Sequence, residues 1–364
     1  MDDNLIFLDK LETLRSSIDK LDDQIINMLN VRAKLALDVG KLKQSISENK
    51  SVLHPDREAK IIERLKKKNH GPFPRTAVSS VWTEIISACR SLEQSITVAY
   101  LGPKGSFSEQ AAIEHFGHSV KLLVCSSIDE VFRVVETESA NVGMVPVENS
   151  TEGSINRSLD LLFSTSLKII GERSLAISHC LMTQTGSMVN ITHIFAHPQA
   201  LAQCQLWIKS HYPNLPLMTV SSNSEAARIA LENKNIAAIA GEMAANVWNL
   251  KIVANSIQDE GNNRTRFVSI GKINTCFSGR DKSSLILAVP NKAGAVCKML
   301  EPFTKHKVSM TKFESRPAKT EQWEYYFYID IQGHKDEIHI SKALKELQSK
   351  VVFFKLLGSY PISY

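Results

Sequence analysis

The first segment of the chain, residues 1–95, carries charged residues on predicted helices, and clustered cations there would suit a small dianionic substrate. They are Arg15, Arg32, Lys43, Arg57, Glu58 and Glu93. Arg32 and Lys43 lie about three helical turns apart and share one face, whereas Arg15 points about 100° away. Cations that face two directions from one helix suit a dimer whose sites take residues from both chains. Taken alone, Arg32 could equally be a snorkelling arginine or half of a buried ion pair, and Arg57–Glu58 an exposed pair at a helix end.

Four short polar stretches in the middle of the chain follow apolar segments that we predict to be strands. They are GPKGSFS (102–108), PVENSTEGSIN (146–156), AHPQALAQC (196–204) and NNRTRF (262–267). In α/β proteins the turns after strands carry function, so the hydroxyl and amide groups of these turns predict a small-molecule site. The first stretch lacks the GxGxxG spacing of a dinucleotide site. Each stretch alone is equally consistent with an ordinary turn or a helix cap.

Three patterns of hydrophobicity predict a multidomain protein with three domains. Residues 1–95 are almost wholly helical, and their apolar residues follow the steps of three and four of a coiled coil. This seam comprises Leu11, Leu14, Ile18, Leu21, Ile25 and Met28. Residues 96–278 alternate short strands with helices, which predicts an α/β domain with parallel sheets in two lobes. The polar stretch 279–284 is predicted to be a linker, and residues 283–364 follow the βαββαβ order of a ferredoxin-like α+β domain.

The composition excludes several classes of protein. A formal charge of +5 over 364 residues, with no basic stripe interleaved with aromatics, disfavours a nucleic-acid partner. The six cysteines are scattered, without CxxC pairs or zinc-ligand spacing, so we expect no metal and free thiols in the cytosol. No apolar run approaches the roughly 18–20 residues of a membrane span, and the acidic start MDDNLIFLDK lacks a signal-peptide pattern.

The helical segment resembles the all-helical chorismate mutases, through LRSSIDKLDDQIINMLNVRAKLALDVGKLK, PDREAKIIERL and IISACRSLEQ. The resemblance implies an intertwined dimer in which Arg15 of the partner chain and Arg32 hold the substrate carboxylates. Lys43 and Glu93 would contact the breaking ether oxygen, and Arg57 and Glu58 would orient the ring and its hydroxyl. Such a Claisen rearrangement needs a fixed conformer and well-placed donors, with no nucleophile, metal or cofactor. This chain departs from some relatives at His54, where they carry aspartate, and at Glu93, where they carry glutamine.

Residues 96–275 resemble prephenate dehydratase, a two-lobed enzyme built like a periplasmic binding protein, and the TRF triplet is the sharpest mark. The resemblance implies that Thr265 delivers a proton to the departing ring hydroxyl, that Arg266 binds a carboxylate, and that Phe267 packs nearby. Further polar contacts would come from Ser106, Asn149, Ser150, Thr151 and Gln203. Loss of carbon dioxide drives aromatisation, so no cofactor is expected. Ala196 stands where some relatives have serine.

The C-terminal segment resembles the ACT regulatory domain, through NKAGAV (291–296) and ESRP (314–317). The resemblance implies a phenylalanine site formed where two such domains pair. Its residues would be Asn291, Gly294, Ala295, Val296, Glu314, Ser315, Arg316 and Pro317. A helix that begins after Gly294 would offer free N–H groups to an amino-acid carboxylate. From the element order alone, an unrelated βαββαβ domain is equally open.

The order of the three segments is similar to that of the family that fuses a chorismate mutase to a prephenate dehydratase. It implies a cytosolic enzyme of phenylalanine biosynthesis that is feedback-inhibited by phenylalanine and forms at least a homodimer. One alternative is action on arogenate, which the fused mutase disfavours. A second is a non-catalytic phenylalanine sensor, and a third is a DNA-binding helical arm, disfavoured by the interleaved acids Asp19, Asp22 and Asp23.

Overall fold

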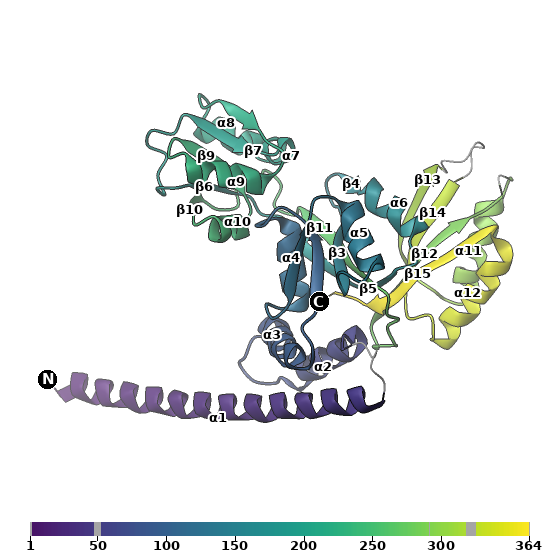
Figure 1. The fold of residues 1–364 in the computed structure, drawn as a ribbon, viewed down its shortest axis with the longest axis horizontal. Coiled ribbons are helices and arrows are strands. Elements are labelled where there is room, and N and C mark those ends of the chain that lie inside the picture. Colours follow the sequence, from purple (N-terminus) through teal and green to yellow (C-terminus); the bar gives the residue numbers. More distant parts are fainter. Residues whose placement is uncertain (1, 47–51, 291, 318–324, 364) are drawn as a thin grey trace.

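Three domains are visible in a computed structural model that describes residues 2–46, 52–290, 292–317 and 325–363 (Figure 1). A two-lobed α/β domain occupies the middle, with the C-terminal domain packed against its first lobe. The helical segment lies on another side of that lobe, and its long first helix extends away from the rest of the molecule. The predicted multidomain fold class is confirmed.

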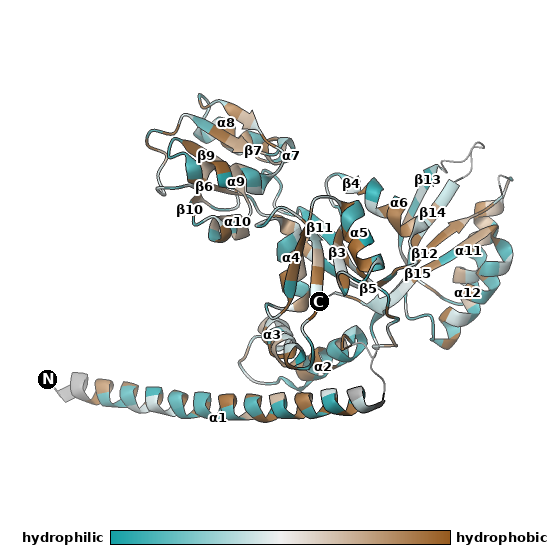
Figure 2. Ribbon diagram, viewed as in Figure 1, coloured by the Kyte–Doolittle hydropathy of each residue, from teal (hydrophilic) through white to brown (hydrophobic). Residues whose placement is uncertain are grey.

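The helical segment consists of α1 (Asp2–Ile46), α2 (Pro55–Lys68) and α3 (Arg75–Glu93). The C-terminal part of α1 packs on α3, where the buried Gly40 lets the two helices approach, because a Cβ there would lie 3.1 Å from Glu93 Cγ. The apolar seam of α1 stays exposed, with Leu14 64% and Met28 70% accessible. Figure 2 shows hydrophobic residues recurring between hydrophilic ones along the extended helix.

The first lobe is built on a mixed sheet of strand order β2-β1-β3-β11-β5, with the short β4 paired to β3. Its elements are β1 (Thr97–Leu101), α4 (Phe107–Phe116), β2 (Lys121–Cys125), α5 (Ile128–Glu136), β3 (Val142–Asn149), β4 (Gly153–Ser154), α6 (Asn156–Ser164), β5 (Lys168–Ala176) and β11 (Arg264–Gly271). β1 runs parallel to β2 and β3, but β11 runs antiparallel to both of its neighbours. The prediction of parallel sheets was therefore only half right, because the chain leaves this lobe through β5 and returns through β11.

The second lobe repeats this mixed arrangement in a sheet of order β10-β6-β9-β7-β8. Its elements are β6 (Cys180–Thr183), β7 (His193–Ala196), α7 (Pro198–Gln203), α8 (Gln205–His211), β8 (Leu217–Thr219), α9 (Asn223–Glu232), β9 (Ile236–Ala240), α10 (Glu242–Val247) and β10 (Lys251–Ala254). The two segments that connect the lobes lie side by side, because Ile177 N–H donates to Asn263 O at 2.9 Å. The lobes are thus joined by two adjacent segments of chain, and each lobe has its own hydrophobic core.

Local sequence signals explain where several helices of the two lobes begin. A Ser-x-x-Glu pattern starts α4, α5 and α9, and in each the serine hydroxyl accepts a hydrogen bond from the N–H three residues on. The pairs are Ser106/Glu109, Ser127/Glu130 and Ser222/Glu225. Two of these caps, on α4 and α9, stand at the face where the lobes meet.

The C-terminal domain has the predicted βαββαβ order, in an antiparallel sheet of order β13-β14-β12-β15. Its elements are β12 (Asp281–Ala288), α11 (Ala295–Lys305), β13 (Met310–Pro317), β14 (Tyr325–Gln332), α12 (Ile338–Lys350) and β15 (Phe353–Pro361). The predicted linker at 279–284 is wrong, because β12 begins at Asp281. Ser283 and Ser284 are buried there and bond to Ser359 and Tyr360, so their polarity reflects an internal hydrogen-bond network.

No helix within the described ranges is long and apolar enough to cross a membrane.

Candidate active sites

A cleft of about 350 Å³ opens between the two lobes. All four of the polar stretches singled out in the sequence contribute to its walls. Phe107 and Ser108 come from the first, Asn149 and Ser154 from the second. Gln199 and Gln203 come from the third, and Asn263 and Thr265 from the fourth. No lysine or arginine lines the cleft within the part of the chain that the structure describes.

Thr265 lies at the start of β11 and is held by Asn149, which ends the neighbouring strand β3. Asn149 Nδ2 donates to Thr265 Oγ1 and to Asn263 Oδ1, both at 2.9 Å. The amide is fixed in turn, because its Oδ1 accepts from the N–H groups of Thr151 at 3.0 Å and Glu152 at 3.2 Å. Since Thr265 Oγ1 accepts this bond, its own hydrogen is free to be donated into the cleft.

The other predicted contacts divide into one that lines the cleft and three that support its rim. Gln203 lines it. Ser106 instead caps α4 and donates to Leu101 O at 3.1 Å, and the Ser150 hydroxyl accepts from Arg264 N–H at 2.9 Å. Thr151 is exposed, and only its backbone N–H is engaged with Asn149.

Ala196 and His179 are two residues of the second lobe, the first a departure from some relatives and the second a residue that sequence reasoning missed. Ala196 is fully buried in the core of the second lobe and is not among the lining residues, so a serine hydroxyl there would not enter this cleft directly. His179, which directly precedes β6, does line the cleft and was missed. A single histidine between two apolar segments gives no motif, and only its burial in the fold reveals it.

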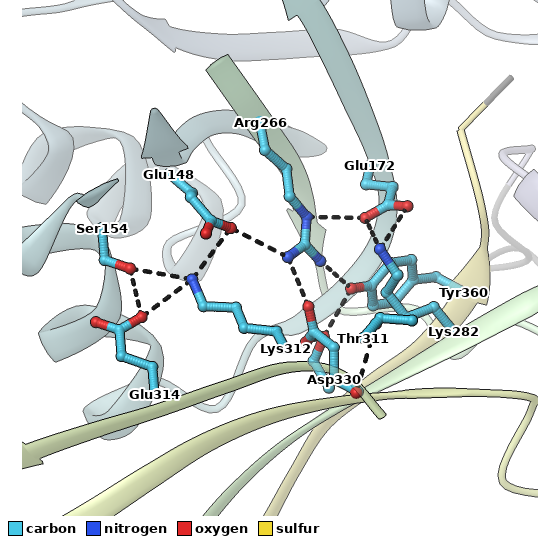
Figure 3. A network of polar contacts seen from close by, with 11 residues as sticks. Glu148, Ser154, Glu172, Arg266, Lys282, Thr311, Lys312, Glu314, Asp330 and Tyr360 are labelled. Atoms are coloured by element: carbon cyan, nitrogen blue, oxygen red, sulfur yellow. Dashed lines mark hydrogen bonds and ion pairs between the residues drawn. The ribbon is translucent and has the colours of Figure 1, made fainter. Parts of the chain in front are cut away.

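Arg266 lies on the other face of β11, away from the cleft and against the C-terminal domain (Figure 3). Its guanidinium donates to Glu172 Oε2 at 2.9 Å, to Asp330 Oδ2 at 2.5 Å and to the Tyr360 hydroxyl at 2.9 Å. Burial lowers the pKa of Arg266, but Tyr360, Asp330 and Glu172 together raise it well above its ordinary value. These partners make Arg266 part of the contact between the first lobe and the C-terminal domain, and its predicted contact with a substrate carboxylate stays a prediction.

Phe267 follows on the cleft side of β11, where it is buried in the core of the first lobe with Phe107 packed against the same cluster. Phe107 lines the cleft, whereas Phe267 is not among the lining residues, so its predicted role beside the substrate stays a prediction. Alternation along the strand therefore places Arg266 on the face of β11 opposite Thr265 and Phe267.

In the helical segment the structure brings two of the predicted residues into contact. Lys43 Nζ lies 3.4 Å from Glu93 Oε2, and both side chains are largely shielded from solvent. Arg32 is half-buried, whereas Arg15 and Arg57 are exposed. This leaves Arg15 available to a second chain, as the resemblance implies.

Glu58 is directed toward the boundary with the α/β domain. Its carboxylate accepts from Arg90 Nη1 at 2.6 Å, and Arg90 Nη2 donates to Phe116 O, at the end of α4, at 2.7 Å. Arg90 is buried, so this cation joins the helical segment to the first lobe. Sequence reasoning missed Arg90, since it lies one turn before Glu93 and carries no separate signal.

The predicted residues of the C-terminal domain fall into two groups. Gly294 is exposed and adopts a left-handed conformation (φ 78°) as the N-cap of α11, with Ala295 and Val296 in the first turn. Glu314 and Arg316, on one face of β13, instead contact the first lobe: Glu314 bonds to Ser154, and Arg316 donates to Asp160 Oδ1 at 2.9 Å. Ser315 and Pro317 are exposed, and Asn291 lies outside the described residues.

Comparison with known proteins assigns each domain to a family. The chain matches the families described as chorismate mutase type II over residues 14–94, prephenate dehydratase over 98–275 and ACT domain over 283–348. It is 46% identical over 350 residues to a bifunctional chorismate mutase/prephenate dehydratase of Neisseria gonorrhoeae, covering 95% of this chain and 96% of the relative. The corresponding protein of Aquifex aeolicus is 43% identical over 358 residues, covering 97% and 98%.

Among solved structures, the prephenate dehydratase of Arthrobacter aurescens in complex with L-Phe superimposes with a TM-score of 0.67 at 30% identity, covering 73% of this chain and 90% of that chain. A structure described as the quorum-quenching acylase GqqA has the same TM-score of 0.67 at 27% identity, covering 73% and 98%. Because this fold carries more than one described activity, the site residues must identify the reaction.

The fold and cleft define a three-domain enzyme, with a helical domain and a ferredoxin-like domain attached to a two-lobed α/β domain that binds a small molecule. The chain belongs to the bifunctional chorismate mutase/prephenate dehydratase family. The prediction of that family is thus confirmed.

Proposed function

We propose that the protein rearranges chorismate to prephenate in its helical domain and converts prephenate to phenylpyruvate in the cleft between the lobes. The observation that carries the second step is the Thr265 hydroxyl, fixed by Asn149 and free to donate its hydrogen. The family that the chain belongs to supports both activities. Six free cysteines support the predicted cytosolic setting.

The dehydration consumes one proton and no cofactor. As the bond to the ring carboxylate breaks, its electron pair completes the aromatic ring while the bond to the ring hydroxyl breaks. The hydroxyl leaves as water with the proton of Thr265, and a solvent proton restores the threonine. A neutral threonine is a weak acid, so the step depends on the geometry that Asn149 and Asn263 hold in place.

The mutase site is proposed to be completed by a second copy of the chain. Lys43 and Glu93 lie together, but Arg15 is far along α1, and the apolar seam between them is exposed. A long apolar face of this kind is stable in water only when another surface covers it. We therefore infer that the protein forms at least a dimer. A monomer in sedimentation velocity would contradict this inference.

Glu93 is proposed to donate a hydrogen bond to the ether oxygen when it is protonated, beside the Lys43 ammonium. Mutase activity should then be highest at low pH, because only a carboxyl group that carries a hydrogen can donate. A Glu93→Gln variant, whose amide always donates, should stay active to higher pH. Glu84→Gln, on the same helix but paired with His118 at the surface, is the matched control. Superimposable pH profiles for wild type and Glu93→Gln would remove Glu93 from this role.

The C-terminal domain is proposed to bind phenylalanine and inhibit the dehydratase. Support comes from the ACT match, from the related structure in complex with L-Phe, and from Glu314, which bonds to the cleft residue Ser154. Phenylalanine can inhibit only if it binds one arrangement of the domains more tightly than another.

One assay tests these proposals together by following chorismate, prephenate and phenylpyruvate with and without phenylalanine. We expect chorismate to be consumed and phenylpyruvate to form, and phenylalanine to suppress the second step. Prephenate that accumulates without phenylpyruvate would overturn the proposed role of the cleft. Turnover that phenylalanine leaves unchanged would overturn the regulatory proposal.

A further inference from the structure

Two buried nitrogen atoms on the second-lobe side of the cleft have no hydrogen-bond partner among the described residues. They are His179 Nδ1 and Gln203 Nε2. The two side chains bond to one another, with His179 Nε2 2.9 Å from Gln203 Oε1. The amide oxygen can only accept, so Nε2 carries the imidazole hydrogen. What remains is a lone pair on His179 Nδ1 and two N–H donors on Gln203 Nε2.

Leaving such groups unpaired is costly, and both residues line the cleft together with Thr265. A buried polar group without a partner costs about 1–3 kcal/mol, and such groups in folded proteins call for an explanation. The imidazole itself is held in place: His179 is 2% exposed, its backbone N–H donates to Gln258 Oε1 at 2.9 Å, and its ring makes a T-shaped contact with Phe107. The unpaired atoms are therefore built into the cleft wall.

The imidazole is neutral in this setting. Burial lowers the pKa of His179, and the bond to Gln203 only partly offsets that effect. Glu152, on the first lobe, is the other titratable side chain among the described residues that line the cleft. A neutral ring whose Nε2 donates to Gln203 must accept at Nδ1.

An acceptor beside a pair of donors suits a substrate that carries both a hydroxyl group and acceptor oxygens. Of the polar groups of prephenate at neutral pH, the two carboxylates and the ketone can only accept, and the ring hydroxyl alone carries a hydrogen to donate. We propose that His179 Nδ1 accepts the hydrogen of the departing ring hydroxyl, while Gln203 Nε2 donates to a neighbouring substrate oxygen.

The assignment rests on the proposed dehydratase site and adds His179 to it as a residue that touches substrate. With the hydroxyl hydrogen directed to His179, the oxygen turns a lone pair toward Thr265, which supplies the proton. The hydroxyl keeps its own hydrogen, and the water that leaves is still bonded to Nδ1. The second lobe thus orients the leaving group, and the first lobe protonates it.

The test compares His179→Leu and His179→Asn in the full-length protein, using prephenate as substrate. Removing the acceptor should lower dehydratase kcat/KM on the order of 10- to 100-fold in His179→Leu. The Asn variant can supply an acceptor oxygen and should recover part of that loss. Chorismate turnover by the same preparations reports whether the chain is folded.

The pH profile separates a contact with substrate from a merely structural role. Wild-type dehydratase activity, with the enzyme-free rate subtracted, should decline as acid protonates Nδ1, in a limb below the ordinary histidine pKa of about 6.5. His179→Asn should lack that limb. His197→Asn is the matched control, because His197 caps α7 without lining the cleft and asparagine is itself a good cap. It should retain the limb.

Two results would overturn the inference: kcat/KM unchanged in His179→Leu, or an acid limb that persists in His179→Asn. Either outcome with an active wild type leaves the dehydratase proposal intact. A wild-type protein that forms no phenylpyruvate would instead overturn the proposed function itself.

Discussion

Replacing Thr265 by alanine should abolish phenylpyruvate formation while chorismate is still converted to prephenate. The substitution removes the hydroxyl that Asn149 positions in the cleft, and general-acid groups contribute about 10²–10⁴-fold to a rate. We expect a loss of that size in dehydratase kcat, with prephenate accumulating in the coupled assay. The fold should tolerate the change, because Asn149 keeps its bond to Asn263 and both of its backbone contacts.

Thr265→Ser is the matched variant for this experiment. It keeps the hydroxyl and should retain part of the activity, although the β-methyl that limits rotation is lost. Mutase turnover in the same sample shows that the chain is folded. Phenylpyruvate formed at the wild-type rate by Thr265→Ala would remove this residue from the chemistry and leave the cleft without an identified acid.

The elements of this chain could be predicted because local pattern and tertiary fold agree. The step of three and four along α1, the apolar strands before each polar turn and the βαββαβ order all reappear in the structure. The four polar turns also meet at one cleft, as the strand-end rule and the family resemblance both predicted. The sequence alone did not predict the direction of each strand. β11 runs antiparallel to β3, and no local periodicity indicates this.

Residues adjacent in sequence proved harder to assign, because neighbours on a strand face opposite ways. Thr265 and Phe267 share one side of β11. Arg266 points to the other side, where it donates hydrogen bonds to Glu172 and Asp330. The ESRP motif behaves similarly: Glu314 and Arg316 contact the first lobe, and Ser315 between them is exposed. The partners of these cations come from distant segments, so only the folded chain identifies them.

The same contacts place the C-terminal domain directly behind the cleft. Lys312 Nζ lies 3.0 Å from Ser154 Oγ and 3.1 Å from Glu148 Oε2, and Glu148 adjoins Asn149 (Figure 3). The residues before Asn149 and after Thr265 are thus both held by ion pairs to this domain. A shift of the domain would act on the two strand ends that carry the proposed proton donor.

Arg266→Leu should destabilise the protein far more than a surface substitution would. It leaves Asp330 buried without its cation and removes one of the two cations bound to Glu172, of which Lys282 remains. Breaking a buried ion pair costs about 3–5 kcal/mol of unfolding free energy. For a folding unit of about 150–250 residues, that loss lowers the unfolding midpoint by roughly 6–20 °C. Calorimetry of the full chain measures the shift.

Arg264→Leu is the matched control, two residues earlier on the same strand. Arg264 is exposed and its guanidinium donates to the hydroxyl and carbonyl oxygens of Ser174, so its loss should change stability by about 0.5 kcal/mol or less. Arg266→Lys should fall between the two, because an ammonium keeps the charge but cannot reach three partners in the planar geometry of a guanidinium. If Arg266→Leu instead melts like wild type and binds prephenate poorly, the guanidinium belongs to the substrate carboxylate after all. Ion pairs to Glu172 and Asp330 would then be a resting arrangement that substrate displaces, and the C-terminal domain would be released whenever the cleft fills.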